Sequence, residues 1–228
     1  MQQISKVFSF FGPPGSGKGT LARQCEVFGI HLLSTGDLCR KHVALGDAIG
    51  KEVDSYLLQG HLVPDTLMMQ MVKNWFLHEA NDGKPVILDG FPRTKIQAQS
   101  FLEFLKAELP QVSFEVVVFT LPDKDILDRL AVRFVCQVAT CQEVYNMTAK
   151  RPLKDGICDK CSKPLTRRND DNFKVIIERL RIFPQYRNDL MDFYKKNGCN
   201  VTDFSVTGLS VQEVFEKFKK ILVDAQLI

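Results

Sequence analysis

A glycine-rich loop near the start of the chain places the strongest limit on its fold. The stretch FFGPPGSGKGT, residues 10–20, follows the apolar run KVFSFFG and leads into TLARQCEVF, which has helical period. A strand, a glycine-rich turn and a helix in this order present backbone N–H groups and a helix N-terminus to an anion. The loop is therefore predicted to bind nucleotide phosphates, with Lys18 along the β- and γ-phosphates. The predicted contacts are Gly15, Ser16, Gly17, Lys18, Gly19 and Thr20.

Gly19 raises the question of how a metal is held. Such loops usually carry at this position a Ser or Thr that ligates Mg²⁺. Thr20 comes one residue later, so its hydroxyl is expected to reach a phosphate instead. Mg²⁺ dehydrates reluctantly and is often held through water by carboxylates. Asp89, directly after the apolar run KPVIL, is the candidate for such a contact.

Short apolar runs recur along the chain and alternate with longer segments of helical period. They cover residues 6–12, 31–34, 84–90, 115–122 and 199–204. The alternation predicts a doubly wound α/β fold with a five-stranded parallel sheet buried on both faces. Such a sheet binds ligands beyond the carboxyl ends of its strands. Residues 35–64 and 134–170 break the alternation, and we expect them to be insertions over that edge.

Composition argues against several classes of partner. The 228 residues include 30 Lys and Arg against 27 Asp and Glu, which leaves a net charge of +3. This balance gives no support for a nucleic-acid or membrane partner. No apolar run approaches the ~18 to 20 residues of a membrane span. We expect a soluble cytoplasmic monomer, with a mitochondrial location left open.

Several motifs follow the predicted strands: STGDLCR, GHLVPD and LDGFPRT, with Gln97 four residues after Arg93. Together with GPPGSGKGT they resemble the adenylate kinase family in order and spacing, over essentially the whole chain. The resemblance implies a P-loop kinase that transfers a phosphoryl group reversibly from a nucleoside triphosphate to AMP with Mg²⁺. The implied parts are a core of residues 1–34, 65–133 and 171–228, an AMP-binding insertion at 35–64 and a lid at 134–170.

The same resemblance implies the residues of the site. Arginine suits the task because its planar fork matches phosphate oxygens. The implied AMP-binding residues are Thr35, Arg40, His61, Leu62, Val63, Gly90, Arg93, Gln97, Arg168 and Arg179, with Gln97 reading the adenine edge. The implied donor-binding residues beyond the loop are Arg129, Arg133, Val144, Tyr145 and Ser210. The implied catalytic residues, which stabilise charge on the transferring group, are Lys18, Arg93, Arg133, Arg168 and Arg179.

Spacing predicts how these arginines are held. Arg129 and Arg133 are four residues apart, which predicts one helix face. Arg168 and Arg179 are also roughly cofacial if one helix covers both. Phe134 stands where the family often has a second arginine beside Arg133.

Four of the seven cysteines are close in the sequence, at Cys136, Cys141, Cys158 and Cys161. Two pairs of this kind are typical of hairpin turns that bring four thiolates to one structural Zn²⁺. Relatives with a zinc-bearing lid usually have two residues between the first two cysteines, and this chain has four. Unmetallated cysteines and a redox pair are the alternatives. A closed four-sulfur site would leave no coordination position for substrate.

The substrates are less constrained than the reaction. A purine donor read through backbone near VTGLS, residues 206–210, is compatible with ATP or GTP. A pyrimidine monophosphate kinase is one alternative, which Gln97 and the long lid disfavour. A non-catalytic nucleotide sensor is another, which the joint presence of Lys18 and the arginines disfavours.

Overall fold

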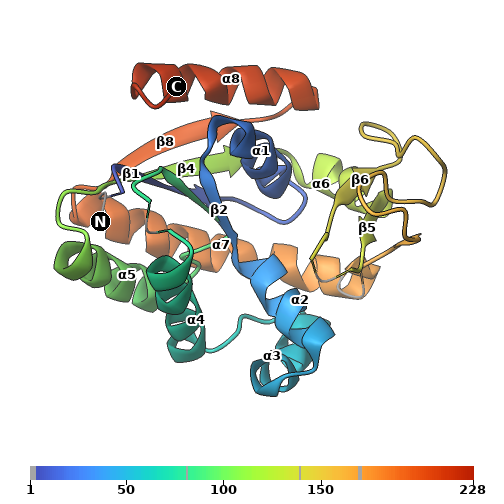
Figure 1. Cartoon of the computed structure of the whole chain (residues 1–228), viewed down its shortest axis with the longest axis horizontal. Helices are drawn as coiled ribbons and strands as arrows, with labels where there is room; N and C mark the ends of the chain where they lie inside the picture. The colour runs from blue at the N-terminus through green and yellow to red at the C-terminus, as the bar shows by residue number, and fades with distance from the viewer. Residues whose placement is uncertain (1–3, 81, 139, 169–170) are drawn as a thin grey trace.

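A five-stranded parallel sheet forms the centre of the fold, with helices on both faces (Figure 1). The computed structural model describes residues 4–80, 82–138, 140–168 and 171–228. The strand order is β2–β3–β1–β4–β8. The strands are β1 (Lys6–Phe11), β2 (His31–Ser34), β3 (Val86–Asp89), β4 (Ser113–Thr120) and β8 (Asn200–Ser205). Each lies on one of the predicted apolar runs, so the predicted doubly wound α/β fold is confirmed.

The helices divide between the two faces of this sheet. Helices α1 and α8 pack on one face, and α4, α5 and α7 cover the other (Figure 1). Their bounds are α1 (Lys18–Cys25), η1 (Glu26–Phe28), α4 (Asp65–His78), α5 (Lys95–Glu108), α6 (Asp123–Ala131), α7 (Phe173–Lys196) and α8 (Val211–Asp224). Among the described helices, none is both long and apolar enough to cross a membrane.

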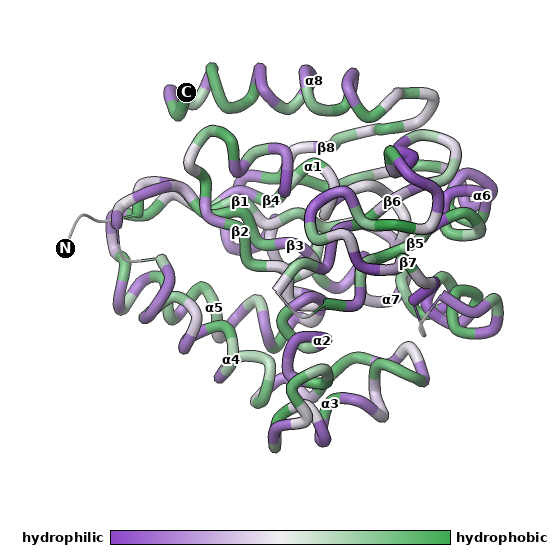
Figure 2. Tube along the Cα trace, turned by 45° about the vertical axis from the view of Figure 1, so that its right-hand side comes forward, coloured by the Kyte–Doolittle hydropathy of each residue, from purple (hydrophilic) through white to green (hydrophobic). Residues whose placement is uncertain are grey.

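The core follows from the alternation of side chains along β1. Phe8 and Phe10 pack with α1 and α8, whereas Val7 belongs to the core on the opposite face. The ring of Phe218 from α8 meets the rings of Phe8 and Phe10 edge-on, with centroids 5.5 and 4.9 Å apart. Hydrophobic segments accordingly concentrate along the central strands in Figure 2. This packing fixes the carboxyl end of β1, where the glycine-rich loop begins.

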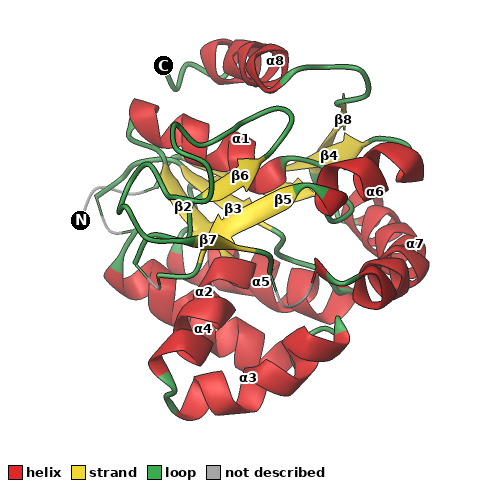
Figure 3. Cartoon of the chain, turned by 90° about the vertical axis from the view of Figure 1, so that its right-hand side faces the viewer, coloured by secondary structure: helices red, strands yellow, loops and turns green. Residues whose placement is uncertain are grey.

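Two insertions extend from the sheet. The helices α2 (Thr35–Leu45) and α3 (Ala48–Gln59) form a hairpin between β2 and α4. The strands β5 (Arg133–Cys136), β6 (Val144–Asn146) and β7 (Leu165–Thr166) form a separate antiparallel sheet in the order β6–β5–β7. Figure 3 shows this small sheet, hereafter the lid sheet, in front of the central strands.

The predicted shared helix face of Arg129 and Arg133 is wrong, and no single helix covers both Arg168 and Arg179. Helix α6 ends at Ala131, and Arg133 instead opens β5, where it is paired with Asn146 of β6. Helix α7 begins at Phe173 with Asn172 as its N-cap, so Arg168 lies before the helix. Pairing with β6 overrides the helical spacing at Arg133, and the Asn172 cap starts α7 after Arg168.

Removal of the Phe218 ring should destabilise the protein without affecting the site directly. The side chain is fully buried against Phe8 and Phe10. Phe218→Ala is expected to lower the free energy of unfolding by about 3 to 5 kcal/mol, because it leaves a cavity in the core. Urea denaturation measures this. Phe173→Ala is the control, since Phe173 is 71% exposed; equal losses in the two variants would contradict the packing.

Candidate active site

The glycine-rich loop joins β1 to α1 in a conformation that requires glycine. Gly15 and Gly17 have φ angles of 76° and 93°, in the left-handed region that side chains disfavour. Gly17 is the N-cap of α1, and no side chain caps the helix there. The first N–H groups of α1 therefore point into the loop, where an anion can accept from them.

Lys18 lies folded into this loop. Its ammonium donates hydrogen bonds to Gly12 O at 2.8 Å, Pro13 O at 2.7 Å and Ser16 Oγ at 3.0 Å. Burial lowers the pKa of Lys18 to about 7; Asp89 raises this pKa, and the arginines Arg93, Arg179 and Arg133 lower it further. The loop is thus a place where a further negative charge would stabilise the ammonium form.

Gly19 allows a carboxylate to lie directly against the loop. A Cβ atom built at Gly19 would be 2.8 Å from Asp89 Oδ2. The same oxygen accepts a hydrogen bond from Ser34 Oγ at 3.3 Å. A side chain at position 19 would therefore require the Asp89 carboxylate to move from this place. The sequence predicted a role for Asp89 but not this contact, because the two residues are distant in the chain.

Seven of the predicted AMP-binding residues line one small pocket of about 40 Å³ between α2, α4 and β3. They are Thr35, His61, Leu62, Val63, Gly90, Arg93 and Gln97. Cys39, Leu57 and Met68 also line this pocket and were not predicted. Their apolar character gave no signal that distinguishes them from core residues.

The amide of Gln97 is held in a fixed orientation. Its Oε1 accepts from the backbone N–H of Arg93 at 2.8 Å, and its Nε2 donates to Asp65 Oδ1 at 2.8 Å. Thr94, the N-cap of α5, also donates to Asp65 Oδ1, at 2.9 Å. These bonds use one lone pair of Oε1 and one N–H of Nε2. They also fix the direction of the remaining lone pair and the remaining N–H. Asp65 ends the GHLVPD motif, and its hydrogen bonds to Gln97 and Thr94 could not be predicted from that motif.

The remaining predicted residues line a larger cleft of about 250 Å³ next to the loop. They are Arg40, Arg129, Arg133, Val144, Tyr145, Arg168, Arg179 and Ser210, and Arg93 lines both spaces. The lid sheet, α2 and the loop each form part of its wall. The structure therefore brings together cationic side chains that are widely separated in the sequence.

Arg133 is fixed by a buried carboxylate. Its Nε donates to Asp171 Oδ2 at 2.7 Å, and its Nη2 donates to the other oxygen. The Asp171 side chain has no exposed surface. Such bidentate pairing sets the plane of the guanidinium. No motif in the sequence marks Asp171.

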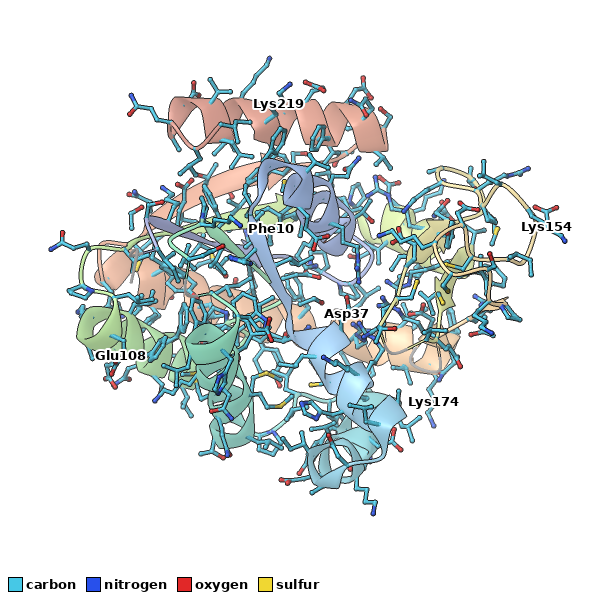
Figure 4. The ribbon with its side chains drawn as sticks, viewed as in Figure 1. Phe10, Asp37, Glu108, Lys154, Lys174 and Lys219 are labelled. Atoms are coloured by element: carbon cyan, nitrogen blue, oxygen red, sulfur yellow. The ribbon has the colours of Figure 1, made fainter. Side chains whose placement is uncertain are left out.

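Asp37 lies near the centre of the molecule (Figure 4). Its carboxylate lies within 4 Å of three arginines. Its Oδ2 accepts from Arg23 Nη2 at 2.5 Å, and its Oδ1 accepts from Arg40 Nη2 at 2.5 Å. Arg168 Nη2 lies 3.8 Å from Oδ1. Burial raises the pKa of Asp37, but Arg40, Arg168 and Arg23 outweigh burial and hold the pKa below its usual value. Asp37 is therefore an anion among phosphate-binding candidates.

Arg129, Tyr145, Leu209 and Ser210 also line the large cleft. Arg129 Nη2 donates to Val206 O at 3.5 Å. Ser210 caps α8 in a reciprocal arrangement with Glu213. Tyr145 lines the cleft, but its hydroxyl accepts from the N–H of Asp159 at 2.7 Å on the side of the cysteines. The Tyr145 hydroxyl is thus hydrogen-bonded to the segment that carries Cys158.

The four clustered cysteines converge in the lid region. The Sγ atoms of Cys136 and Cys161 are 3.3 Å apart, those of Cys141 and Cys158 are 3.6 Å apart, and all four sulfurs lie within 4.8 Å of one another. Four sulfurs placed tetrahedrally about Zn²⁺ at ~2.3 Å would be about 3.8 Å apart. The cluster is compatible with that metal despite the longer Cys136–Cys141 spacing.

Hydrogen bonds at Cys158 suit a thiolate. Burial raises the pKa of this thiol, but hydrogen bonds from the backbone of Cys161 and Lys160 and from the Tyr145 hydroxyl outweigh burial and lower the pKa to about 6. Metal-bound cysteines are deprotonated. Burial instead raises the pKa of the Cys136 and Cys141 thiols, so these two would lose their protons on metal binding. The four converging sulfurs are a donor set that fits a structural zinc site.

The fold and the cleft together define a class of protein. A P-loop on a doubly wound sheet, with a small pocket and a larger cleft meeting at Lys18 and the arginines, is the arrangement of a nucleotide kinase.

Comparison with known proteins gives the family. The sequence model described as "Adenylate kinase" matches residues 10–199. Proteins named adenylate kinase are 39% identical over 219 residues in a Hydrogenobaculum species (95% of this chain, 100% of the relative) and 37% identical over 216 residues in Archaeoglobus fulgidus (92% and 98%). One from Methanothrix thermoacetophila is 35% identical over 212 residues (92% and 95%). The chain belongs to the adenylate kinase family and is a phosphotransferase.

The lowered pKa of Lys18 predicts proton uptake on nucleotide binding. At pH 8 a lysine with a pKa of about 7 is mostly neutral in the free protein. Triphosphate oxygens favour the ammonium form, so ATP binding at pH 8 should take up most of one proton per site, and much less at pH 6. Calorimetry in buffers of different ionisation enthalpy measures this uptake.

Lys18→Gln is the control for that titration, because it removes the titrating group while keeping a polar side chain. The uptake at pH 8 should be lost in this variant, after protons exchanged by ATP itself have been subtracted. Equal proton uptake by the two proteins at pH 8 would show that Lys18 is already charged in the free protein.

Proposed function

We propose that the chain transfers the γ-phosphoryl group of MgATP to AMP and so produces two ADP, acting as a monomer. The observation that carries this proposal is the meeting of two spaces at one cationic centre. Lys18 and Arg179 line the large cleft beside the loop, and Arg93 lines both this cleft and the small pocket. A triphosphate on the loop and a monophosphate below it would bring their reacting ends to the same side chains.

The proposed chemistry needs positioning and charge rather than a general base. The acceptor phosphate is itself an anionic nucleophile. Lys18, Arg93, Arg133, Arg168 and Arg179 would stabilise charge that builds up on the transferred group. Asp171 supports this role because it fixes the guanidinium plane of Arg133 before any nucleotide binds.

We assign the small pocket to AMP. Its base would lie near the fixed amide of Gln97 and the backbone of His61, Leu62 and Val63. Its phosphate would lie towards Arg40, Arg93, Arg168 and Arg179, beside Thr35 and Gly90. Gln97 supports a purine acceptor because it lines the pocket and its amide, fixed by Asp65 and the Arg93 backbone, has a further N–H and a further lone pair with which to bind a base.

We assign the large cleft to ATP in preference to GTP. Guanine presents N–H donors at N1 and N2 that a carboxylate recognises well. Among the described residues that line this cleft, the acidic ones are Asp37 and Asp89, and both lie near the proposed phosphate positions. The base end offers Ser210, which caps α8, and the neighbouring Leu209. A backbone carbonyl can accept from the adenine amino group.

Mg²⁺ would enter with the triphosphate. The carboxylate of Asp89 lies against Gly19 and next to Ser34, which suits a contact to the ion through water. The ion would supply charge neutralisation of the phosphates. Gly19 supports this arrangement because it leaves the space that Asp89 occupies.

We further propose three structural parts with different tasks. The core comprises residues 1–34, 65–133 and 171–228, the AMP-binding part residues 35–64 and the lid residues 134–170. Closure of the lid would exclude water that otherwise competes with AMP for the phosphoryl group. Placement of Val144 and Tyr145 in the wall of the donor cleft supports this task.

Turnover with AMP tests the proposal directly. The wild-type protein should form ADP from AMP and MgATP, followed by coupled absorbance, with lower kcat/KM for GTP and for UMP or CMP. Arg93→Ala should lower kcat/KM for AMP by roughly tenfold or more, because the arginine lies where both phosphates would meet. Arg181→Ala, an exposed arginine on α7, is the matched control. Normal turnover by Arg93→Ala would remove this residue from the site.

We also propose that Cys136, Cys141, Cys158 and Cys161 hold one structural Zn²⁺ in the lid. The convergence of the four sulfurs and the thiolate-stabilising hydrogen bonds at Cys158 support this assignment. A four-sulfur site is closed, so the ion would stabilise the lid and take no part in phosphoryl transfer.

Metal analysis should find one zinc per chain in the purified protein. Cys158→Ser should lose the metal and lower the melting temperature, because the lid loses its cross-link. Cys199→Ser is the control, because Cys199 lies outside the cluster. This variant should keep the bound zinc and the wild-type melting temperature. If the protein is produced in medium with ample zinc and the purified protein contains no bound zinc, the assignment is contradicted.

A further inference from the structure

The lid touches the AMP-binding part through a small ring of hydrogen bonds centred on Asp37. Arg23 Nη2 donates to Asp37 Oδ2 at 2.5 Å and to the backbone oxygen of Gln142 at 3.3 Å. The side chain of Gln142 returns a hydrogen bond from Nε2 to the backbone oxygen of Asp37 at 3.1 Å. We call this ring of Arg23, Asp37 and Gln142 the clasp.

Each member of the clasp comes from a different part of the molecule. Arg23 lies on α1, which is anchored to the central sheet by buried Leu21 and Cys25. Asp37 is in the first turn of α2, where its backbone N–H donates to Ser34 Oγ. Gln142 belongs to the segment between β5 and β6. The clasp therefore joins the core, the AMP-binding part and the lid at one point.

A backbone turn in the lid segment places Gln142 for this contact. Gln142 has a φ angle of 47°, in the left-handed region, and its N–H donates to Val138 O at 3.1 Å. It directly follows Cys141, one of the four clustered cysteines. The turn that carries the second thiol of the cluster thus also presents Gln142 to α2.

The two oxygens of Asp37 have separate partners. Oδ2 is held by Arg23, whereas Oδ1 lies at Arg40 and near Arg168. A phosphate that draws Arg40 and Arg168 away from Oδ1 would leave the Oδ2 contact with Arg23 in place. The clasp can therefore persist while the acceptor phosphate binds beside it.

We propose that Arg23 and Gln142 are positioning residues that fasten the lid to the first turn of α2, and so couple lid closure to the arginines beside the acceptor phosphate. This inference rests on the proposed roles of Arg40 and Arg168 and of the lid. Arg23 supplies the fixed point on the core, Asp37 transmits the contact to α2, and Gln142 carries it to the lid.

A distance measurement without nucleotide tests the clasp independently of catalysis. Labels carried on unnatural amino acids at positions 51 and 154 report the separation of α3 and the lid tip and leave the native cysteines untouched. Lys154 lies at the outer end of the lid (Figure 4). Arg23→Ala and Gln142→Asn should each shift the distance distribution to longer values, and the double variant should shift it little further, because both break the same ring.

The variants are chosen so that folding and charge are controlled. Asparagine tolerates the left-handed backbone of position 142 but is too short to reach α2. Arg23→Lys keeps the charge and should restore part of the closed population. Arg181→Ala and Gln99→Ala remove an exposed arginine and an exposed glutamine that bond within α7 and α5. Both controls should resemble the wild type, and unchanged melting temperatures would show that the clasp variants fold.

If the closed lid excludes water from the site, weakening the clasp should increase ATP hydrolysis relative to phosphoryl transfer. In Arg23→Ala and Gln142→Asn, the ratio of ATP hydrolysis without AMP to phosphoryl transfer with AMP should rise roughly fivefold or more. A distance distribution unchanged from wild type in Arg23→Ala, or an equal shift in Arg181→Ala, would overturn the clasp. A shift in distance with no ADP formed by the wild type would instead uphold the clasp and refute the proposed function.

Discussion

The concentration of positive charge around Lys18 is the constraint on which the rest of the structure depends. Arg93, Arg133 and Arg179 all lower the pKa of this buried lysine. Cations this close repel one another, so a fold that assembles them needs compensating anions and rigid supports. The nucleotide phosphates supply the missing charge only when they bind. Before that, carboxylates of the protein must hold the cluster together.

Three aspartates perform this task, and each defines a part of the site. Asp171 fixes Arg133 at the base of the lid, and Asp37 gathers Arg23, Arg40 and Arg168. Asp89 lies against the phosphate loop, in space that exists because residue 19 is glycine. The residue that first looked like a missing metal ligand is thus the one that admits a carboxylate.

The fold and the phosphate loop could be predicted because their signals are local. Each strand is marked in the sequence by a short apolar run with polar, glycine or proline residues at its ends. The phosphate loop is marked by glycines between a strand and a helix. The family motifs also pointed to the residues of the small pocket. The predictions that failed relied on helical spacing across lid residues, where Arg133 lies in a strand and Arg168 lies before α7. Pairing with β6 makes the segment at Arg133 a strand, and the Asn172 cap sets the start of α7.

The supporting residues could not be read from the sequence. Asp65, Asp171 and Gln142 act through partners far away in the chain, and no spacing rule connects them to those partners. Their importance follows only from geometry, because an isolated aspartate or glutamine in a polar segment is usually a surface residue.

The central claim is that two nucleotides place their phosphates in one shared cationic site. Two adenosines joined by a polyphosphate chain would occupy both spaces at once, and calorimetry gives the affinity and the number of molecules bound per chain. We expect one molecule to bind per chain, with an affinity at least about 100-fold higher than that of ATP or AMP alone. Two molecules per chain, each bound no more tightly than ATP, would contradict it.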